Sequence, residues 1–313
     1  MKKVAISIGD LNGIGIQLAL ENHDALCKIV SPLYCIDEAM LTQASKKLNL
    51  TIPNDFQTIE NIALYFDIEA GVVSKESGAY AYASFEKAVE LAKKKKVDAI
   101  CTLPIHKKAW ELAGVSYKGH TDALRDFFNA EAIMMLGCEK MYVALFTEHI
   151  PLKEVASSIN EKDLTRFLLD FYNTAKPKST VAVLGLNPHA GDDGVLGDEE
   201  VIIQKVIDNV NMTLRQAQGT VSEPVEAYSD PLVPDVAFTP NVRKSYTHYI
   251  AMYHDQGLAP LKALYFDEGI NVSLNLPILR TSVDHGTAFD IAYKGITLNN
   301  LSYINAIKYI TDT

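Results

Sequence analysis

Short apolar runs alternate with longer amphipathic segments along the 313 residues of this chain, and this alternation restricts the fold more than any other feature. Apolar runs of strand length occur at residues 4–8, 62–66, 97–103, 180–186 and 236–238. Helical spacing of apolar residues occurs at residues 84–96, 164–172 and 199–214. Strands separated by helices are typical of crossover connections in a largely parallel sheet. The predicted class is therefore α/β, and residues 216–235 are predicted to form a loop.

The composition predicts a globular chain that binds neither nucleic acid nor membrane. Hydrophobic residues make up 48% of the chain, enough for the core of one large or two moderate domains. The net charge of −10 argues against binding along a phosphate backbone, which depends on clustered Lys and Arg. The four consecutive lysines at 93–96 are interpreted as the solvated end of a helix. No apolar run has the length of a membrane span and no signal-peptide pattern follows Met1, so a cytoplasmic location is expected.

The four cysteines do not predict a metal site. Cys27, Cys35, Cys101 and Cys138 form no CxxC pair, and most of their sequence neighbours are not metal-ligand types. They are interpreted as reduced core residues.

Two glycine-containing turns could bind a ligand. Gly9, Gly13 and Gly15 lie between a predicted strand and a helix, where the backbone can approach a ligand closely and the helix N-terminus offers free N–H groups. Their spacing is not GxGxxG, so an ordinary tight turn explains them equally well. Further along the chain, His120 and Thr121 offer a polar pair for a phosphate or hydroxyl group. Alternatively, Thr121 is the N-cap of a helix.

Three histidines each follow an apolar run of strand length. They are His149, His189 and His254. If these runs are neighbouring strands, the three imidazoles can meet at one edge of the sheet. Three histidines with open coordination positions suit a divalent metal that also binds substrate, and Asp255 could orient or supplement them. A single histidine is more often a satisfied core residue, so this prediction depends on the placement that all three share.

Residues 253–288 contain many metal-ligand types, cations and glycines, and we interpret them as one wall of a site. Lys262, Asn271 and Arg280 lie in mostly apolar surroundings. There a phosphate or carboxylate would form strong charge-assisted hydrogen bonds. The alternative is that the two cations are surface residues beside acidic neighbours.

A set of motifs is more specific than any of these features alone. The motifs are Glu76-Ser77-Gly78, Gly119-His120-Thr121, Asn187-Pro188-His189-Ala190-Gly191, Tyr253-His254-Asp255-Gln256-Gly257 and Arg280-Thr281-Ser282-Val283-Asp284-His285-Gly286-Thr287-Ala288. Through them the sequence resembles the 4-hydroxythreonine-4-phosphate dehydrogenases, the PdxA family of NAD-dependent enzymes in pyridoxal phosphate biosynthesis. The resemblance covers nearly the whole chain.

The resemblance implies a fold and an assembly. The fold would be the two-domain α/β fold of isocitrate and isopropylmalate dehydrogenases, with a central cleft and without a GxGxxG Rossmann motif. Residues 1–118 and 290–313 would form one domain. Residues 119–289 would form the other, carrying the metal and much of the substrate site. A homodimer would share its active sites between both subunits.

The resemblance also implies which residues hold each ligand. A divalent metal, Zn, Mg or Co, would be held by His149, His189 and His254. The phosphorylated substrate would contact His120, Thr121, Lys262, Asn271 and Arg280. Residues 285–292 resemble the adenosine-binding loop of isocitrate and isopropylmalate dehydrogenases. NAD, with NADP left open, would contact Gly13, Gly15, His285, Gly286, Thr287 and Asp290.

The first glycine turn departs from the family pattern Gly-Asp-Pro-Ala-Gly-Ile-Gly-Pro-Glu. Leu11-Asn12 replace Pro-Ala and Ile16-Gln17 replace Pro-Glu, so the turn loses rigidity and one carboxylate. The proline-rich pattern before Asp235 is only partly matched, although Asp235 aligns with the family's acidic position.

The reaction that the resemblance implies is the oxidation of 4-phosphooxy-L-threonine at its secondary alcohol by NAD. A bound metal would lower the pKa of the alcohol, and the β-keto acid formed would lose CO₂ to give 3-amino-2-oxopropyl phosphate. Asp235, Asp255 and Lys262 are all candidates for the general base. One alternative is a related dehydrogenase of threonate or erythronate phosphate. Another is a transferase or binding protein for a phosphorylated metabolite.

Overall fold

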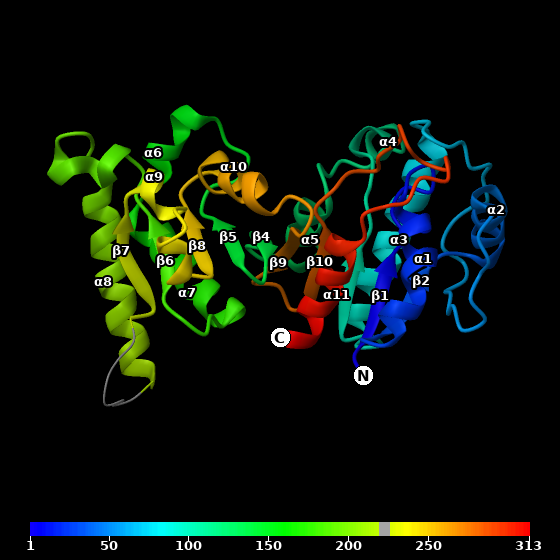
Figure 1. Cartoon of the computed structure of the whole chain (residues 1–313), viewed down its shortest axis with the longest axis horizontal. Helices are drawn as coiled ribbons and strands as arrows, with labels where there is room; N and C mark the ends of the chain where they lie inside the picture. Colours follow the sequence, from blue (N-terminus) through cyan, green and yellow to red (C-terminus); the bar gives the residue numbers. More distant parts are fainter. Residues whose placement is uncertain (219–225) are drawn as a thin grey trace. The chain divides into compact units, whose positions relative to one another are not determined.

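The chain forms two compact α/β units. The computed structural model describes residues 1–218 and 226–313. Unit 1 comprises Met1–Ala132 and Asp267–Thr313, and unit 2 comprises Ile133–Phe266. Unit 1 therefore contains both termini, which are the blue and red ends of the chain in Figure 1.

The strands of unit 1 follow the spatial order β2-β1-β3-β10-β9. They are β1 (Lys3–Ser7), β2 (Ser31–Cys35), β3 (Ala99–Thr102), β9 (Ile270–Leu274) and β10 (Leu279–Val283). The first four in this order are parallel, whereas β9 is antiparallel to β10. Parallel pairing aligns the carboxyl ends of β1, β3 and β10 along one edge, where open α/β sheets place their ligand sites.

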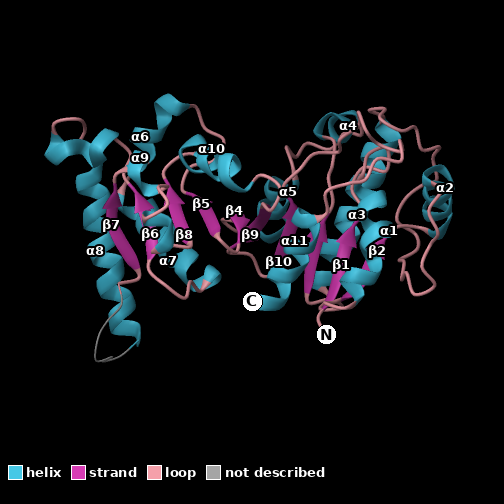
Figure 2. Cartoon of the chain, in the orientation of Figure 1, coloured by secondary structure: helices cyan, strands magenta, loops and turns pink. Residues whose placement is uncertain are grey.

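Helices cover both faces of these strands. They are α1 (Gly15–Cys27), α2 (Glu38–Leu48), α3 (Lys75–Lys93), α4 (Lys107–Leu112), α5 (His120–Phe128) and α11 (Leu301–Asp312). Helix α3 packs on the face that carries Leu33 and Ile100. Side chains alternate along a strand, so Tyr34 faces the opposite side, where Tyr303 of α11 lies close to it. Figure 2 shows these helices around the strands.

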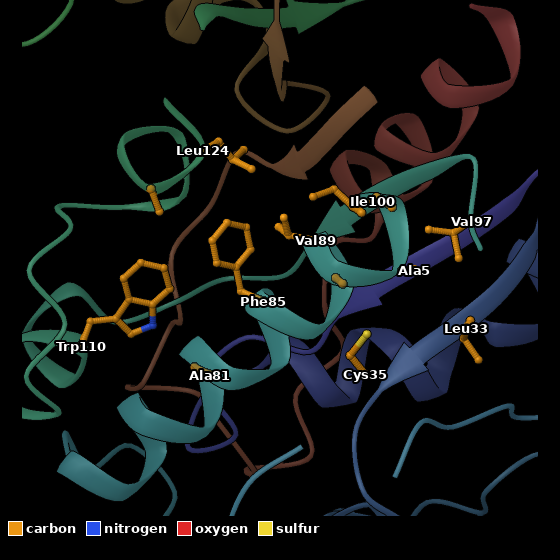
Figure 3. Close-up of a cluster of buried hydrophobic side chains, with 13 residues drawn as sticks. Ala5, Leu33, Cys35, Ala81, Phe85, Val89, Val97, Ile100, Trp110 and Leu124 are labelled. Atoms are coloured by element: carbon orange, nitrogen blue, oxygen red, sulfur yellow. The ribbon is translucent and has the colours of Figure 1, made fainter. Parts of the chain in front are cut away.

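The core beneath α3 is built around aromatic side chains. Phe85 of α3 and Trp110 of α4 are fully buried, and their ring centroids are 6.0 Å apart. Figure 3 shows Phe85 at the centre of the cluster with Trp110 beside it. Full burial of a side chain the size of Phe85 contributes about 2–3 kcal/mol. This cluster holds α3, α4 and α5 together against the strands.

Helix α3 begins nine residues before the predicted helix at 84–96. The Ser74 hydroxyl oxygen accepts a hydrogen bond from the Ser77 N–H at 3.1 Å and so caps the first turn. The helix ends at Lys93, and Lys95 adopts a left-handed φ of 53°. The lysines at 93–96 are exposed, which confirms their interpretation as the solvated end of a helix.

The strands of unit 2 follow the order β4-β5-β8-β6-β7. They are β4 (Ile133–Cys138), β5 (Met141–Leu145), β6 (Val181–Leu184), β7 (Tyr228–Leu232) and β8 (His248–Ala251). Strands β4 and β5 are antiparallel, and β5, β8, β6 and β7 are parallel. The prediction of largely parallel strands is therefore confirmed in each unit.

The helices of unit 2 include the long α7 and α8, which pack against each other. In the described part of unit 2 they are η1 (Leu152–Glu154), α6 (Val155–Ser158), α7 (Glu161–Ala175), η2 (Pro188–Gly194), α8 (Glu199–Gln218), α9 (Pro234–Ala237), η3 (Val242–Lys244) and α10 (His254–Tyr265). Asn160 caps α7, because its side chain accepts a hydrogen bond from the Asp163 N–H at 2.9 Å.

Two predicted strands are wrong. Residues 62–66 form an irregular segment in which Leu64 is 90% exposed, so this apolar run packs against no neighbouring strand. It follows a turn at Asn61, whose backbone N–H donates to the Asp37 carboxylate. Residues 236–238 lie in and directly after the short helix α9, which begins at Pro234, a residue favoured in the first turn of a helix.

The predicted loop at 216–235 is also wrong in part. Helix α8 continues to Gln218, and strand β7 occupies 228–232, whereas 219–225 lie outside the described residues. The Asn211 side chain exchanges two hydrogen bonds with the backbone of Tyr228, which fixes the start of this strand. Pro231 lies within β7, and a proline in a run argues against a strand except at an edge.

The division into units differs from the predicted one. Helix α5, β9 and β10 belong to unit 1, although they lie within the range 119–289 predicted for the second domain. Strand pairing is the reason, because β10 pairs with β3 through Arg280 and Ile100. Thr121 of α5 in turn contacts Ser273 of β9, with the two hydroxyl oxygens 3.5 Å apart.

Three of the four free cysteines are core residues, as predicted. Cys35, Cys101 and Cys138 are buried, and burial raises the pKa of the Cys101 thiol to about 12. Cys27 is the exception, because it is half-buried and contacts His23. Within the described ranges, no helix combines the length and hydropathy that a membrane span requires.

Gly9, two residues after the end of β1, provides a test of why this turn requires glycine. Its φ is +71°, and a Cβ there would lie 2.3 Å from the Pro104 carbonyl oxygen. Gly114 has a φ of +84° with no atom within 4 Å of the corresponding position, so it is a matched control for backbone strain alone. Gly9→Ala is expected to destabilise the chain by about 2–4 kcal/mol and Gly114→Ala by about 1 kcal/mol.

Urea unfolding of both variants measures this difference. Equal losses in the two variants would show that the close approach of Pro104 does not require glycine at position 9.

Candidate active site

Arg280 of β10 is a buried cation whose described partners are all uncharged. Its side chain is held by neighbouring strands, because Arg280 is directly opposite Ser273 on β9 and Thr102 lies two residues beyond its partner on β3. Nη2 donates to the Thr102 hydroxyl at 2.8 Å, and Nη1 donates to the Ser273 hydroxyl at 3.2 Å. The Asn271 side-chain oxygen lies 3.5 Å from Nη1.

This environment is costly for the guanidinium charge. Arg280 is only 3% exposed, and burial lowers its pKa to about 10. Within residues 1–218 and 226–313, its Nε has no hydrogen-bond partner. A buried charge is usually paired, and an anionic ligand would supply both the missing counter-charge and an acceptor.

His120, at the start of α5, presents a second unmatched polar group. Its Nδ1 lies 3.2 Å from Arg280 Nη2, and because an arginine nitrogen can only donate, Nδ1 must accept. The proton is therefore on Nε2, which is buried and lacks a partner in the described part of the chain. Burial, reinforced by the Arg280 charge, lowers the pKa of His120 well below its usual value. His120 is thus a neutral donor beside a cation.

Two further predicted substrate residues lie in the same group. Thr121 is buried next to Ser273, and Asn271 is on the same strand as Ser273. Thr121 is inside α5 rather than at its N-cap, because the helix begins at His120 with Gly119 as its cap residue. The structure therefore brings together four of the five predicted substrate residues in unit 1, namely His120, Thr121, Asn271 and Arg280.

The two predicted cofactor segments are in contact with each other. The Ile14 N–H donates to the Thr287 carbonyl oxygen at 3.1 Å. A Cβ at Gly13 would lie 2.8 Å from that oxygen, and a Cβ at Gly15 would lie 2.7 Å from the Ile8 carbonyl oxygen. Glycine at both positions therefore permits close backbone packing, which accounts for them without a ligand.

The segment after β10 still offers groups for a ligand. His285 Nδ1 lies 3.3 Å from the Gly286 carbonyl oxygen and donates to it, so Nε2 is an acceptor. That nitrogen is buried with no partner among the described residues. Burial lowers the pKa of His285, which keeps the ring neutral. Thr287 is buried, whereas Gly286 and Asp290 are exposed.

The three histidines of unit 2 follow three adjacent parallel strands. His149 follows β5, His254 follows β8 and His189 follows β6, in the spatial order β5-β8-β6. This placement at the carboxyl ends is as predicted. The imidazoles of His149 and His254 are near each other, with ring centroids 5.5 Å apart.

The two rings differ in their support. His254 Nδ1 lies 2.7 Å from an Asp255 carboxylate oxygen, which leaves Nε2 available to a ligand. His149 Nδ1 lies 4.0 Å from the Glu148 carboxylate. In the described ranges, the three histidines do not form a group whose ligand atoms all lie within 4.8 Å of one another. Their joint role as metal ligands stays a prediction.

His189 is in an unusual left-handed turn. His189, Ala190, Asp192 and Asp193 all have φ between 44° and 55°. Each such residue costs on the order of 1 kcal/mol or more unless its surroundings hold it in place. Glu200 provides that support by accepting hydrogen bonds from the backbone N–H groups of Leu186 and Asn187, both at 2.7 Å.

Glu200 also accepts from the Asn187 side-chain amide at 2.9 Å, so one carboxylate fixes the whole start of the turn. Burial raises the pKa of Glu200, but the hydrogen bonds from Asn187, Leu186 and its own backbone N–H together outweigh this effect and lower the pKa. Gly191 makes the turn possible, since a Cβ there would lie 2.8 Å from a Glu200 oxygen. Glu200 thus positions the segment that carries His189.

Gln256 links the strand ends that carry His189 and His254. Its side-chain oxygen accepts from the Met252 N–H at 2.7 Å, and its amide donates to the Gly185 carbonyl oxygen at 2.6 Å. The next residue, Gly257, lets α10 approach β5 closely, because a Cβ there would lie 2.4 Å from a Val143 methyl carbon.

The three predicted general-base residues differ in their surroundings. Asp255 contacts His254 directly, which suits it to orienting that ring. Lys262 lies about two turns after Asp255 on the same face of α10, and its Nζ lies 5.5 Å from the centroid of the Phe266 ring. Asp235 is exposed in α9, a helix that contacts η2.

Several residues of the site were missed from the sequence. Thr102 and Ser273 hold Arg280, Glu200 holds the His189 turn, and Asp10 is buried in the first glycine turn. The acidic first turn of α8 directly after the His189 segment was the available signal for Glu200. Nothing local indicated Thr102 or Ser273, because both depend on strand register.

Comparison with models of known protein families identifies the family of the chain. A family model described as pyridoxal phosphate biosynthetic protein PdxA matches residues 28–310. The chain belongs to the PdxA family. The resemblance predicted from the motifs is therefore confirmed.

Relatives in the PdxA family match along nearly their whole length. A 4-hydroxythreonine-4-phosphate dehydrogenase of Sulfurimonas denitrificans is 59% identical over 98% of this chain and 96% of its own. A protein of the same name from Campylobacter fetus is 50% identical over 99% of this chain and 97% of its own. The crystal structure of a 4-hydroxythreonine-4-phosphate dehydrogenase from Burkholderia phymatum has a TM-score of 0.77 and 31% identity, covering 99% and 97% of the two chains. The predicted α/β fold is thereby confirmed.

Asp10 provides a pH-dependent test of the first glycine turn. Its carboxylate accepts from the Asn12 N–H at 3.0 Å and from the Ser77 hydroxyl at 3.2 Å, yet burial outweighs these bonds and raises its pKa to about 6. A raised folded pKa means that the folded state loses stability as pH rises from about 4 to 6, because the unfolded chain ionises first. Above pH 6 the loss is constant at about 3 kcal/mol.

Asp10→Asn removes this ionisation while keeping the side-chain shape. The variant is expected to match the wild type near pH 4 and to be about 2–3 kcal/mol more stable at pH 8. Urea unfolding at both pH values measures the difference. A variant that is less stable than the wild type at pH 8 would contradict the raised pKa.

Proposed function

We propose that the chain is a 4-hydroxythreonine-4-phosphate dehydrogenase that oxidises 4-phosphooxy-L-threonine with NAD in pyridoxal phosphate biosynthesis. The observation that carries this proposal is the 59% identity to a relative of that name over 98% of the chain. The immediate product is a 2-amino-3-oxo acid phosphate. As a β-keto acid, it loses CO₂ to give 3-amino-2-oxopropyl phosphate.

Arg280 and His120 bind an anionic group of the substrate. The guanidinium is desolvated and its described partners are neutral hydroxyl, amide and imidazole groups. Charge-assisted hydrogen bonds to a phosphate or carboxylate are about twice as strong as neutral ones, and desolvation increases their strength further. The His120 Nε2–H adds a donor that stays neutral, so the site holds an anion without requiring protonation of His120. Thr121 and Asn271 border this pair. Lys262 is proposed as a substrate-binding residue of unit 2.

His149, His189 and His254 hold a divalent metal. The donor set fits, because His254 keeps Nε2 available while Asp255 fixes its Nδ1, and the rings of His149 and His254 are adjacent. When bound, the metal supplies a Lewis acid that lowers the pKa of the substrate's secondary hydroxyl. Glu200 and Gln256 hold the backbone segments that carry His189 and His254.

A side chain must accept the proton of the secondary hydroxyl as hydride leaves for NAD. Asp255 is committed to orienting His254, so Lys262 and Asp235 are the candidates for the general base. Lys262 would act in its neutral form and Asp235 as a carboxylate.

NAD is bound by the segment after β10 together with the first glycine turn. His285 offers an unpaired acceptor at Nε2, and Gly286 and Asp290 are exposed. Gly13 keeps the turn packed against Thr287, and Gly15 lets the start of α1 pack closely on Ile8. The proposal includes a homodimer that shares its active sites, and a cytoplasmic location.

A substrate and cofactor panel tests the proposed reaction. NADH should form from 4-phosphooxy-L-threonine with Zn, Mg or Co present. Unphosphorylated 4-hydroxy-L-threonine should give a kcat/KM at least about 100-fold lower, since it lacks charge-assisted contacts worth about 1.5–3 kcal/mol each. The same assay with NADP measures cofactor preference.

Three outcomes would contradict parts of the proposal. Faster turnover of threonate or erythronate phosphate would make the chain a related dehydrogenase. Failure to bind NAD would favour a transferase or binding protein for a phosphorylated metabolite. Full NADH production by a thoroughly metal-free preparation would remove the role of the histidines as metal ligands.

A further inference from the structure

Three different metal-ligand side chains meet at the end of helix α1 in unit 1. They are His23, Cys27 and Asp55. His23 and Cys27 are one helical turn apart, so both lie on the same face of α1. Asp55 comes from the loop that follows α2. The ligand atoms of all three lie within 4.8 Å of one another.

The nitrogen His23 Nε2 is the centre of this group. It lies 3.1 Å from an Asp55 carboxylate oxygen and 3.3 Å from the Cys27 sulfur. A single ring nitrogen carries either one proton or one lone pair. If protonated, it can form only one good hydrogen bond, and if unprotonated, its lone pair faces the carboxylate. A cation between the three atoms would satisfy all of them at once.

The separations match a tetrahedral zinc site. With Zn–N and Zn–O near 2.1 Å and Zn–S near 2.3 Å, tetrahedral ligands lie about 3.4–3.6 Å apart. The observed 3.1 Å and 3.3 Å require shifts of only a few tenths of an ångström. One thiolate, one imidazole and one carboxylate suit Zn²⁺ better than Mg²⁺ or Ca²⁺, which prefer oxygen ligands.

The surroundings of His23 provide the support that a metal ligand needs. Its side chain is 1% exposed, and its Nδ1 lies 3.0 Å from the Tyr34 hydroxyl, which can accept the proton of that nitrogen. Phe56 packs beside the ring at 5.0 Å and stacks on Tyr34 at 3.8 Å. The imidazole is therefore fixed in orientation.

The other side of the group is open to solvent. The Asp55 side chain is 71% exposed and Cys27 is half-buried. A metal ion can enter from this side, and a water molecule can complete the coordination.

We propose that His23, Cys27 and Asp55 form a binding site for Zn²⁺ or a similar borderline-soft divalent cation. Binding converts the Cys27 thiol to a thiolate and releases its proton to solvent, forming one metal–sulfur bond without any redox change. The ion joins α1 to the loop that carries Asp55, so its effect is to hold that loop in place. The site is independent of the proposed dehydrogenase reaction, because the histidines assigned to the catalytic metal are in unit 2.

Cobalt substitution tests the site without relying on activity. A Co²⁺ titration of the full chain should produce a thiolate-to-cobalt charge-transfer band in the near ultraviolet, and Zn²⁺ should displace it. Cys27→Ser should abolish the band. Asp55→Asn should weaken Co²⁺ binding at this site at least about tenfold. The other three cysteines are buried, so they do not account for such a band.

Asp24→Asn is the matched control. Asp24 is exposed on the same helix and raises the local negative charge near Cys27, but it is not one of the three ligands. Its replacement should leave the band and the Co²⁺ affinity unchanged within about twofold. Zn²⁺ should also raise the unfolding temperature of the variant that lacks His149, His189 and His254, and this shift should disappear when Cys27→Ser is added.

Either of two results would overturn the proposal. A band of equal intensity in Cys27→Ser would place the thiolate ligand elsewhere. The absence of any band in the wild type at millimolar Co²⁺ would show that the three side chains form only a hydrogen-bond network, with Tyr34 donating to Nδ1 and Nε2–H donating to Asp55.

Discussion

Parallel strand pairing is the constraint on which the rest of this structure depends. In unit 2, β5, β8 and β6 are adjacent and parallel, so the segments after all three begin at the same edge. In unit 1, the pairing of β10 with β3 gives Arg280 a hydroxyl partner from Thr102. Both predicted groups of ligand residues therefore arise from strand order, with no requirement that their members be close in sequence.

Two buried ionisable groups lower the stability of the folded chain. The guanidinium of Arg280 and the carboxylate of Asp10 are both removed from water. Burial lowers the pKa of Arg280 and raises the pKa of Asp10, so it favours the neutral form of each group. Neither has a described partner of opposite charge. Functional sites commonly retain such unfavourable groups, because a ligand supplies the missing interaction. Arg280 has the more direct interpretation, since an anion would satisfy both its charge and its unpaired Nε.

The sequence predicted what depends on local pattern. Apolar runs located β1, β3 and β6, and helical periodicity located α3, α7 and α8. The apolar runs before His149 and His254 correspond to β5 and β8, so the three histidines were placed at carboxyl ends of strands. The strand prediction was wrong for residues 62–66, because an apolar run does not report whether a neighbouring strand exists. It also missed β2, β4, β9 and β10, and it missed β7, which contains Pro231 and pairs with β6.

The partners that Arg280 contacts from distant strands could not be predicted from the sequence, for a physical reason. Ser273 and Thr102 reach Arg280 only through the register of β9, β10 and β3. The spacing of His23 and Cys27 on one helix face was readable in the sequence. Asp55, however, joins them through the fold of a loop. The observed unit boundaries differ from the predicted domain boundaries for the same reason. The pairing of β10 with β3 assigns the segment after residue 266 to unit 1.

The central claim is that Arg280 is an anion site, and the affinity of 4-phosphooxy-L-threonine for Arg280→Met tests it most directly. The matched control is Arg166→Met, which removes the same charge from a side chain that is 52% exposed on α7. By calorimetry, Arg280→Met should bind at least about 100-fold more weakly than the wild type, and Arg166→Met should bind equally well. Unchanged affinity in a folded Arg280→Met variant would contradict the claim.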